Sequence, residues 1–215
     1  NTYAKHRGPD ETNVLQEHGI SALHNLLSIT GKNTPQPVYK DDVIIVFNGE
    51  IYNYRDHGDF NCDTDCIHYL YKKYRMNFAK YIDGEFAIAL YDIRRKHLIV
   101  ASDPFKTKPL YVAFDNNHFG VSTYRSCLSS LGFKKIEFFP ANTIMTYQIP
   151  SHCPILKDEV YGFEVAQYKD TYDDWIKAFE ASICKRTHNV REKIFIGLSS
   201  GHDSGAIFCE MKKQH

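Results

Sequence analysis

The sequence predicts an α+β fold, in which an antiparallel β-rich domain is followed by the opening elements of an α/β domain. Residues 86–123 hold several short strand-like runs separated by charged or Asn-rich turns, which is typical of an antiparallel meander. Residues 172–213 follow the order helix, short apolar strand, Ser/Gly loop and helix, with which a parallel α/β domain begins. The intervening stretch contains Pro150 and Pro154 and lacks periodicity, as a linker does. We expect a first domain over residues 1–149, a linker over 150–170 and the start of a second domain over 171–215.

The first domain begins its predicted core with a buried strand. Val43–Phe47 is a continuous run of mainly β-branched residues, and Asn48-Gly49 directly after it predicts a tight turn. A helix is predicted over residues 63–75, capped by Asp63 or Thr64. Its apolar residues recur at helical spacing, at Cys66, Ile67, Leu70, Tyr71 and Tyr74.

The predicted meander comprises FAIALYD, HLIVAS, LYVAF and HFGVS, and residues 143–148 add one further strand. In the second domain, residues 172–189 form an amphipathic helix with an apolar face of Trp175, Ile176, Phe179, Ile183 and Cys184. A strand over residues 194–198 and a helix over residues 205–213 complete the expected elements.

The overall composition excludes several classes of partner. Lys and Arg total 26, as do Asp and Glu, so the chain carries no net charge and gives no reason to expect nucleic acid or an anionic membrane. The longest apolar runs have the length of a strand, and no signal peptide is recognisable, so we expect no membrane segment. The six cysteines form no CxxC pair, which favours reduced thiols and a cytoplasmic protein. Zinc binding by Cys62, Cys66 and His68 is disfavoured because no second pair of ligands matches them.

The stretch LSSGHDSG, residues 198–205, is a candidate anion site. Backbone N–H groups of a Ser/Gly turn, the positive end of the following helix and serine hydroxyls together suit phosphate. The alternative is a turn in which Asp203 or Ser204 only caps the helix. The loop is not a Walker motif, because no Gly-x4-Gly-Lys-Ser/Thr occurs in the chain.

Further polar clusters stand in a fixed order along the chain. They are HRGPDE (residues 6–11), FNGEIYN (47–53), CDTDC (62–66), IDGEFAIALYD (82–92), ASDPFKTKPLY (101–111) and FPANT (139–143). Singly, each could be an ordinary turn or a solvated loop. Together with LSSGHDSG, they closely resemble the glutamine-dependent asparagine synthetases. The resemblance covers essentially the whole chain and implies an αββα N-terminal-nucleophile sandwich followed by a truncated ATP-pyrophosphatase-like α/β segment.

The resemblance implies a role for particular residues of the first domain. Asn48 and Gly49 match the family's oxyanion donors, a side-chain amide and a backbone N–H. Glu50 and Asp63 match the residues that hold the α-ammonium group of glutamine. In the family, ammonia released from glutamine reaches the second domain, where ATP activates aspartate.

The same resemblance turns the serine-rich loop into an expected ATP site. Ser199, Ser200, Gly201, Asp203 and Ser204 match the pyrophosphate loop, and Asp203 is the expected partner of magnesium. The expected cofactors are therefore ATP and Mg²⁺, and the expected substrates are glutamine and aspartate. A homodimer, or association with the missing C-terminal portion, is the expected assembly.

The chain departs from the family pattern in three places. The family's nucleophilic cysteine belongs a few tens of residues before HRGPDE, so we expect the chain as given not to hydrolyse glutamine. Leu26 stands where the family has an arginine that clamps the glutamine carboxylate, unless Arg7 or Arg125 reaches the site. Ser200 and Lys106 stand where the family has glycines, and we expect backbone strain at these positions if φ is positive. His202 stands where the family has a small or apolar residue.

These departures leave three functions open. The first is an asparagine synthetase-like protein of which the chain is the N-terminal part. The second is a non-catalytic glutaminase-like binding or structural module. The third is a related ATP-dependent, amide-forming synthetase that has lost its glutaminase activity.

Overall fold

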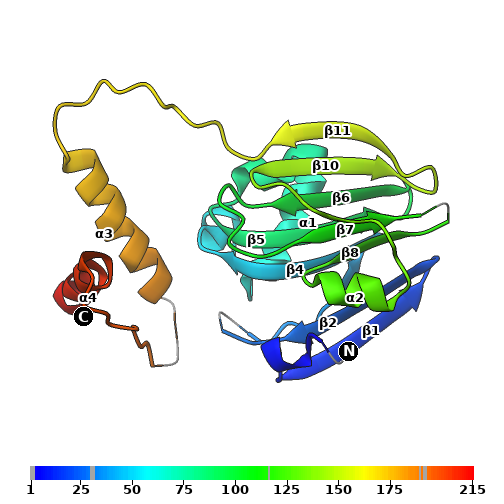
Figure 1. Cartoon of the computed structure of the whole chain (residues 1–215), viewed down its shortest axis with the longest axis horizontal. Helices are drawn as coiled ribbons and strands as arrows, with labels where there is room; N and C mark the ends of the chain where they lie inside the picture. Colours follow the sequence, from blue (N-terminus) through cyan, green and yellow to red (C-terminus); the bar gives the residue numbers. More distant parts are fainter. Residues whose placement is uncertain (1–2, 30–31, 116, 189, 191–192) are drawn as a thin grey trace. The chain divides into compact units, whose positions relative to one another are not determined.

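The computed structural model describes residues 3–29, 32–115, 117–188, 190 and 193–215. The chain divides into two compact units (Figure 1). Unit 1 comprises Lys32–Gly162 with the N-terminal segment up to Ser28, and unit 2 runs essentially from Phe163 to His215. The expected linker over residues 150–170 contains a strand that belongs to unit 1, as described next.

The centre of unit 1 is a six-stranded antiparallel sheet of order β11-β10-β6-β5-β4-β3. Its strands are β3 (Val38–Lys40), β4 (Val43–Ile51), β5 (Gly84–Asp92), β6 (His97–Ser102), β10 (Thr143–Gln148) and β11 (Cys153–Glu159). Strand β11 lies within the expected linker and pairs with β10 over Thr143–Gln148. Its side chains are mostly exposed, so it lacks the apolar alternation that would have identified it in the sequence.

One face of this sheet packs on helix α1 (Asp63–Tyr74) and the 3-10 helix η3 (Arg75–Tyr81). The predicted apolar side of α1 is confirmed, because Cys66, Ile67, Leu70 and Tyr71 are fully or almost fully buried. The predicted side-chain cap is wrong, since the N-cap residue is Cys62 and no side chain caps the helix. Asp63 bonds elsewhere, which determines its position in the candidate site below.

The opposite face of the large sheet packs on a second sheet of order β8-β7-β9. Its strands are β7 (Tyr111–Phe114), β8 (Phe119–Ser122) and β9 (Ile136–Phe138), and the short helix α2 (Arg125–Ser130) packs beside them. Ala87, Val100, Leu110, Val112 and Phe139 are among the buried residues of this second core. The structure thus confirms the predicted mixture of helices and antiparallel strands in the first domain.

The predicted meander changes sheets halfway, between β6 and β7. Asp103 is almost fully buried and holds the crossing loop, because its carboxylate accepts N–H bonds from Phe86, Phe105 and Thr107. Lys106, which stands where the family has glycine, has φ 54°, and its ammonium group lies 3.0 Å from the centre of the Phe138 ring. A cation–π contact therefore accompanies a backbone conformation that favours glycine.

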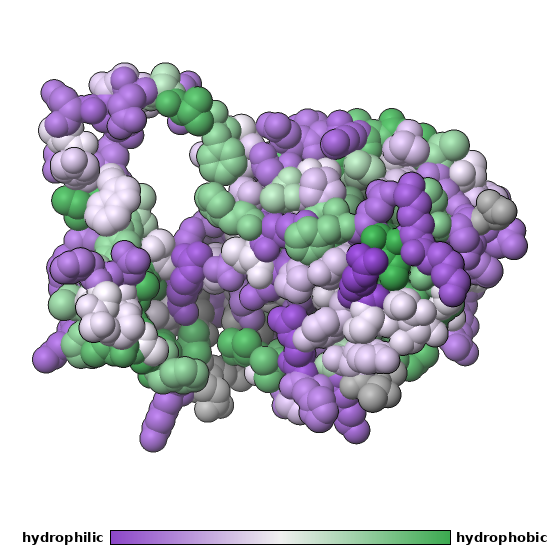
Figure 2. Space-filling view, in the orientation of Figure 1, coloured by the Kyte–Doolittle hydropathy of each residue, from purple (hydrophilic) through white to green (hydrophobic). Residues whose placement is uncertain are grey.

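The N-terminal segment contributes the 3-10 helix η1 (Lys5–Arg7) and a separate hairpin of β1 (Glu11–Glu17) and β2 (Ile20–Leu26). The 3-10 helix η2 (Tyr54–His57) lies between β4 and α1. On the face shown in Figure 2, hydrophilic residues are interspersed with small hydrophobic groups. Among the described residues no helix has both the length and the apolar character needed to cross a bilayer.

Unit 2 contains the helices α3 (Asp173–Thr187) and α4 (His202–Gln214). Both predicted helices are confirmed within a few residues at each end, although Asn189, the predicted end of the first, lies outside the described residues. The predicted strand over residues 194–198 is wrong, because this segment is irregular. The described part of unit 2 contains no strand with which it could pair, and a lone strand has no partner for its backbone hydrogen bonds.

Candidate active site

The candidate active site of unit 1 is built on the free edge of β4. Strand β3 pairs only with Val43–Ile45, so within the described residues the rest of β4 has no neighbouring strand on that side. Backbone groups alternate between the two edges of a strand, so the N–H groups of Phe47, Gly49 and Ile51 share this edge. The Phe47 N–H donates to Gln36 Oε1 at 2.7 Å, and the Ile51 N–H donates to Asp63 Oδ2 at 3.1 Å.

Between these two side-chain acceptors, the Gly49 N–H has no acceptor among the described residues. The predicted turn at Asn48-Gly49 is wrong, because β4 continues to Ile51 in register with β5. Glycine is required here for another reason: a Cβ atom at Gly49 would lie 1.9 Å from the Glu85 carbonyl oxygen. The resulting site is one backbone N–H directed outward between two N–H groups that have side-chain acceptors.

Asn48 and Glu50 lie on the opposite face of β4 from the core residues Phe47 and Ile51, because side chains alternate along a strand. Both are half-buried, and the Asn48 amide makes no side-chain hydrogen bond to a described residue. The structure therefore brings the two predicted oxyanion donors and Glu50 together on three consecutive residues. A side-chain amide and a backbone N–H on consecutive residues are the donor types that suit a developing oxyanion.

A second carboxylate lies directly opposite Glu50 in the sheet. Glu50 pairs with Glu85 of β5, whose carboxylate accepts from Tyr52 Oη at 3.0 Å and lies 3.6 Å from Lys108 Nζ. Sequence reasoning quoted the motifs that contain Glu85 and Lys108 but assigned them no role. Alternation along β5 could have found Glu85, because it puts this residue on the same face as Ala87.

Asp63 is more deeply buried than a residue that binds a soluble ligand is expected to be. It is 6% exposed, and burial, together with the negative charge of Glu50, raises the pKa of its carboxyl to about 7 against the opposing hydrogen bonds from Ile51 and Thr64. Asp65 belongs to the same first turn of α1 and is half-buried. It is the more accessible acidic group of the CDTDC motif.

The β1–β2 hairpin connects to the candidate site through His24. His24 Nε2 lies 3.1 Å from the Phe47 carbonyl oxygen, so it must carry the proton of this hydrogen bond. Burial lowers the pKa of His24 despite this bond, which keeps the ring neutral at pH 7. Together with Gln36, it satisfies both backbone groups of the residue before Asn48.

The position of the missing arginine holds a buried aliphatic side chain. Leu26 is 9% exposed and lies at the end of β2, where Gly8 packs against the Asn25 and Leu26 backbone. Arg7 lies over the ring of Tyr124, with its guanidinium carbon 5.6 Å from the ring centre. The described contacts of Arg7 therefore do not include the Asn48–Glu50 segment, and no contact places Arg125 there.

The serine-rich loop of unit 2 is closed by its own hydroxyl groups. Ser199 Oγ lies 2.9 Å from Ser204 Oγ and accepts the Gly201 N–H, and Ser204 Oγ accepts the Ser199 N–H. Gly201 is the N-cap of α4, Asp203 lies exposed in its first turn, and neither Asp203 nor Ser204 caps the helix with its side chain. Ser200 is exposed and is not among the residues with positive φ, so the expected strain is absent there.

The loop fits magnesium only through a phosphate ligand. Within the described residues, no group of three or more His, Cys, Asp or Glu side chains could hold a metal ion. Asp203 supplies a single exposed carboxylate, and Mg²⁺ is commonly held by one or two carboxylates, water and substrate phosphates. All six cysteines are free, and Cys62 and Cys66 are buried.

Comparison with known proteins identifies the family. A family described as "Glutamine amidotransferase domain" matches residues 1–177. The chain belongs to this family. A solved structure with a similar fold agrees with this assignment. It is the glutamine phosphoribosylpyrophosphate amidotransferase from B. subtilis, complexed with ADP and GMP. The TM-score is 0.50 and the sequence identity 13%, and the match covers 83% of this chain and 47% of that chain.

Among curated proteins, this amidotransferase domain is similar to asparagine synthetases. The nodule asparagine synthetase [glutamine-hydrolyzing] of Pisum sativum is 37% identical over 51% of this chain and 21% of its own length. The putative asparagine synthetase [glutamine-hydrolyzing] 1 of Methanocaldococcus jannaschii is 25% identical over 96% of this chain and 48% of its own length. The chain thus spans about half, or less, of the relatives that it matches.

Proposed function

We propose that unit 1 is the glutamine-binding half of an asparagine synthetase-type protein. The observation that carries the proposal is the Gly49 N–H, which lacks an acceptor among the described residues and stands beside the Asn48 amide on the free edge of β4. Gln36 and Asp63 satisfy the N–H groups on either side, so Gly49 alone is left for a ligand. A carboxamide oxygen that becomes negative on nucleophilic attack would be stabilised there.

The acidic groups beside this edge would hold the α-ammonium group of glutamine. Glu50 is half-buried, and its carboxylate shares the face of β4 with Asn48. Asp63 is a less suitable partner for a cation than the motif implies, because its raised pKa leaves it substantially protonated near pH 7. We therefore propose Asp65, the half-buried carboxylate of the same helical turn, as a second candidate for binding the α-ammonium group, to be compared with Asp63.

We propose that unit 2 begins the ATP-binding half of the same protein. Ser199, Ser200, Gly201, Asp203 and Ser204 would surround the pyrophosphate of ATP at the N-terminus of α4, where helix N–H groups favour anions. The Ser199–Ser204 hydrogen bond would exchange for bonds to phosphate oxygens. Asp203 would position Mg²⁺ through its carboxylate, and the metal would neutralise phosphate charge.

The experiment is an assay on the full-length product of the reading frame. Aspartate, ATP and either glutamine or ammonia are supplied, and AMP release is measured. We expect aspartate-dependent AMP release, which Asp203→Asn should reduce strongly with either nitrogen donor. Glu50→Gln should raise the KM for glutamine and leave the ammonia-dependent reaction unchanged. Absence of AMP release with both nitrogen donors would overturn the proposal.

Leu26 favours a second candidate, a glutaminase-like module that binds or stabilises without catalysis. Its buried aliphatic side chain offers no donor to a carboxylate, and leaving such a charge unpaired costs roughly 3–5 kcal/mol. Calorimetry with glutamine separates the two candidates. Saturable binding of glutamine at sub-millimolar affinity supports the asparagine synthetase-type enzyme. If a correctly folded protein does not bind glutamine, the result supports the non-catalytic module. A synthetase that retains only ammonia-dependent activity would be the third possibility.

A further inference from the structure

A basic cleft lies at the end of the large sheet opposite the candidate active site. It has a volume of about 450 Å³ and is lined by Asp41, Val43, Tyr71, Lys72, Arg75, Asp92, Arg94 and Arg95. Val43 begins β4 and pairs with Asp92 at the end of β5, whereas Ile51 ends β4 at the other side. The rise per residue along a strand therefore separates Val43, at the cleft, from Asn48 by about 17 Å and from Ile51 by about 27 Å.

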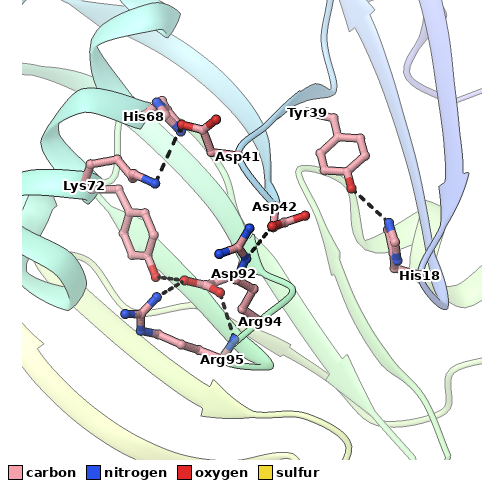
Figure 3. Close-up of polar contacts among 10 residues, drawn as sticks. His18, Tyr39, Asp41, Asp42, His68, Lys72, Asp92, Arg94 and Arg95 are labelled. Atoms are coloured by element: carbon pink, nitrogen blue, oxygen red, sulfur yellow. Dashed lines mark hydrogen bonds and ion pairs between the residues drawn. The ribbon is translucent and has the colours of Figure 1, made fainter.

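The carboxylates around this cleft already have cationic or hydroxyl partners (Figure 3). Asp92 accepts from Tyr71 Oη at 2.6 Å and from Arg95 at 3.0 Å, and Asp42 is paired with Arg94. Asp41 lies 3.5 Å from His68 Nε2 and 3.7 Å from Lys72 Nζ. These contacts leave little unpaired negative charge to repel an anion.

The cations of the cleft are less completely paired than its carboxylates. Arg75 makes no ion pair with a described residue, and its guanidinium carbon lies 5.7 Å from the centre of the Tyr71 ring. Lys72 has only the long contact to Asp41, and Arg95 uses one guanidinium nitrogen on Asp92. The cleft thus holds more free donors than free acceptors.

The backbone at Arg75 supports a functional reason for this residue. Arg75 is the C-cap of α1 and has φ 55° and ψ −129°, a backbone conformation that favours glycine. A bulky residue in such a conformation is strained. The Arg75 side chain is exposed, and its side-chain partner among the described residues is the Tyr71 ring, so its guanidinium group can reach a ligand.

We propose that the basic cleft binds a small phosphate-bearing anion, with Lys72, Arg75 and Arg95 as its ligands. Two guanidinium groups and one ammonium group supply the forked donors and the point charge that phosphate oxygens accept. A volume of this size accommodates a nucleotide or a sugar phosphate. The site is made of other residues than the serine-rich loop and the glutamine edge, and as a separate anion site it would suit regulation.

The experiment is calorimetric titration of the full chain with inorganic phosphate and with pyrophosphate at low ionic strength. It is performed in a Ser204→Ala background, which removes one of the loop's phosphate donors, and binding is assigned to the cleft by the cleft variants. We expect one-to-one saturable binding that Lys72→Gln and Arg75→Gly each weaken at least tenfold. Lys73→Gln is the matched control, because Lys73 lies over the rings of Tyr69 and Tyr74 and does not line the cleft.

Arg75→Gly also separates binding from folding. Because glycine adopts positive φ without strain, this variant should unfold at a higher temperature than the wild type while losing the anion. Binding that is absent in the wild type, or unchanged in both cleft variants, overturns the proposal. Neither result depends on whether unit 1 binds glutamine, so the two proposals fail independently.

Discussion

Gln36 Oε1 accepts the backbone N–H of Phe47 at 2.7 Å and thereby replaces a strand that β4 lacks at this point. Gln36 is 3% exposed, so the bond is shielded from water. His24 Nε2 binds the carbonyl oxygen of the same residue at 3.1 Å. Gln36 and the β2 residue His24 therefore hold both backbone groups of the residue before Asn48, which connects the position of the candidate site to the packing of unit 1.

Replacing Gln36 with Met should destabilise unit 1. Met has a similar volume but accepts only weak hydrogen bonds, so the buried Phe47 N–H would lose its partner at a cost of about 1–3 kcal/mol. Urea unfolding followed by circular dichroism measures the loss. Gln16→Met at an exposed position of β1 is the control and should change the unfolding free energy by less than about 0.5 kcal/mol.

Replacing Asp63 with Asn should change the pH dependence of stability. The native pKa of about 7 lies above the ordinary value of 3.8, so the native state binds the proton more tightly than the unfolded state. The wild type therefore loses stability as pH rises from about 4 to about 7, by at most on the order of 4 kcal/mol. Asp63→Asn, whose amide oxygen still accepts the Ile51 N–H, should lack this slope and be the more stable protein at pH 8. Equal slopes in the two proteins would show that Asp63 is not the buried acid described here.

Replacing Gly49 with Ala should damage the fold as well as the site. The new Cβ would meet the Glu85 carbonyl 1.9 Å away, and both are backbone positions that cannot move independently in a paired sheet. Overpacking of this kind typically costs about 1–3 kcal/mol and sometimes more. Gly162→Ala is the matched control, because nothing lies within 4 Å of its added Cβ and its φ is not positive. Thermal unfolding of both variants tests the close approach, and equal melting temperatures would contradict it.

Replacing Tyr71 with Phe should weaken the junction between α1 and the β5–β6 turn. Its hydroxyl donates to the buried Asp92 carboxylate at 2.6 Å, and a hydrogen bond to a charged group contributes about 1.5–3 kcal/mol. Burial raises the pKa of Asp92, but the bonds from Tyr71 and Arg95 outweigh this and lower it overall. That stability is present above the unfolded pKa and is lost as pH falls through the native pKa. The difference between wild type and Tyr71→Phe should therefore shrink below pH 4, and a constant difference would argue against charge assistance.

The sequence predicted elements with strong periodicity and missed those determined by tertiary partners. Helix α1 follows an apolar pattern with one buried face, and strands β5 and β6 are apolar runs that are buried on both faces of the sheet. Strand β11 carries no such pattern, and its pairing with β10 alone defines it. Residues 194–198 have the composition of a strand but no strand to pair with in the described part of unit 2, so composition alone was misleading there.

For the candidate site, too, the sequence motif identified the residues but not their structural surroundings. Asn48, Gly49 and Glu50 could be selected from their order in FNGEIYN, but the Asn-Gly pair suggested a turn where β4 continues. Local sequence cannot show that an N–H will face an unpaired edge, because this depends on where β3 ends. Gln36 and His24 were missed for the same reason, since each reaches β4 from elsewhere in the chain.

The central claim is that Asn48 and Gly49 form an oxyanion site for a glutamine carboxamide. It is tested most directly by glutamate release from glutamine, measured for the full-length product of the reading frame and for its Asn48→Ala variant. We expect kcat to fall about 10²–10³-fold in the variant with little change in KM, because the donor acts mainly on the transition state. Turnover by the variant at the wild-type rate, or no glutamate release by the wild-type protein, would contradict the claim.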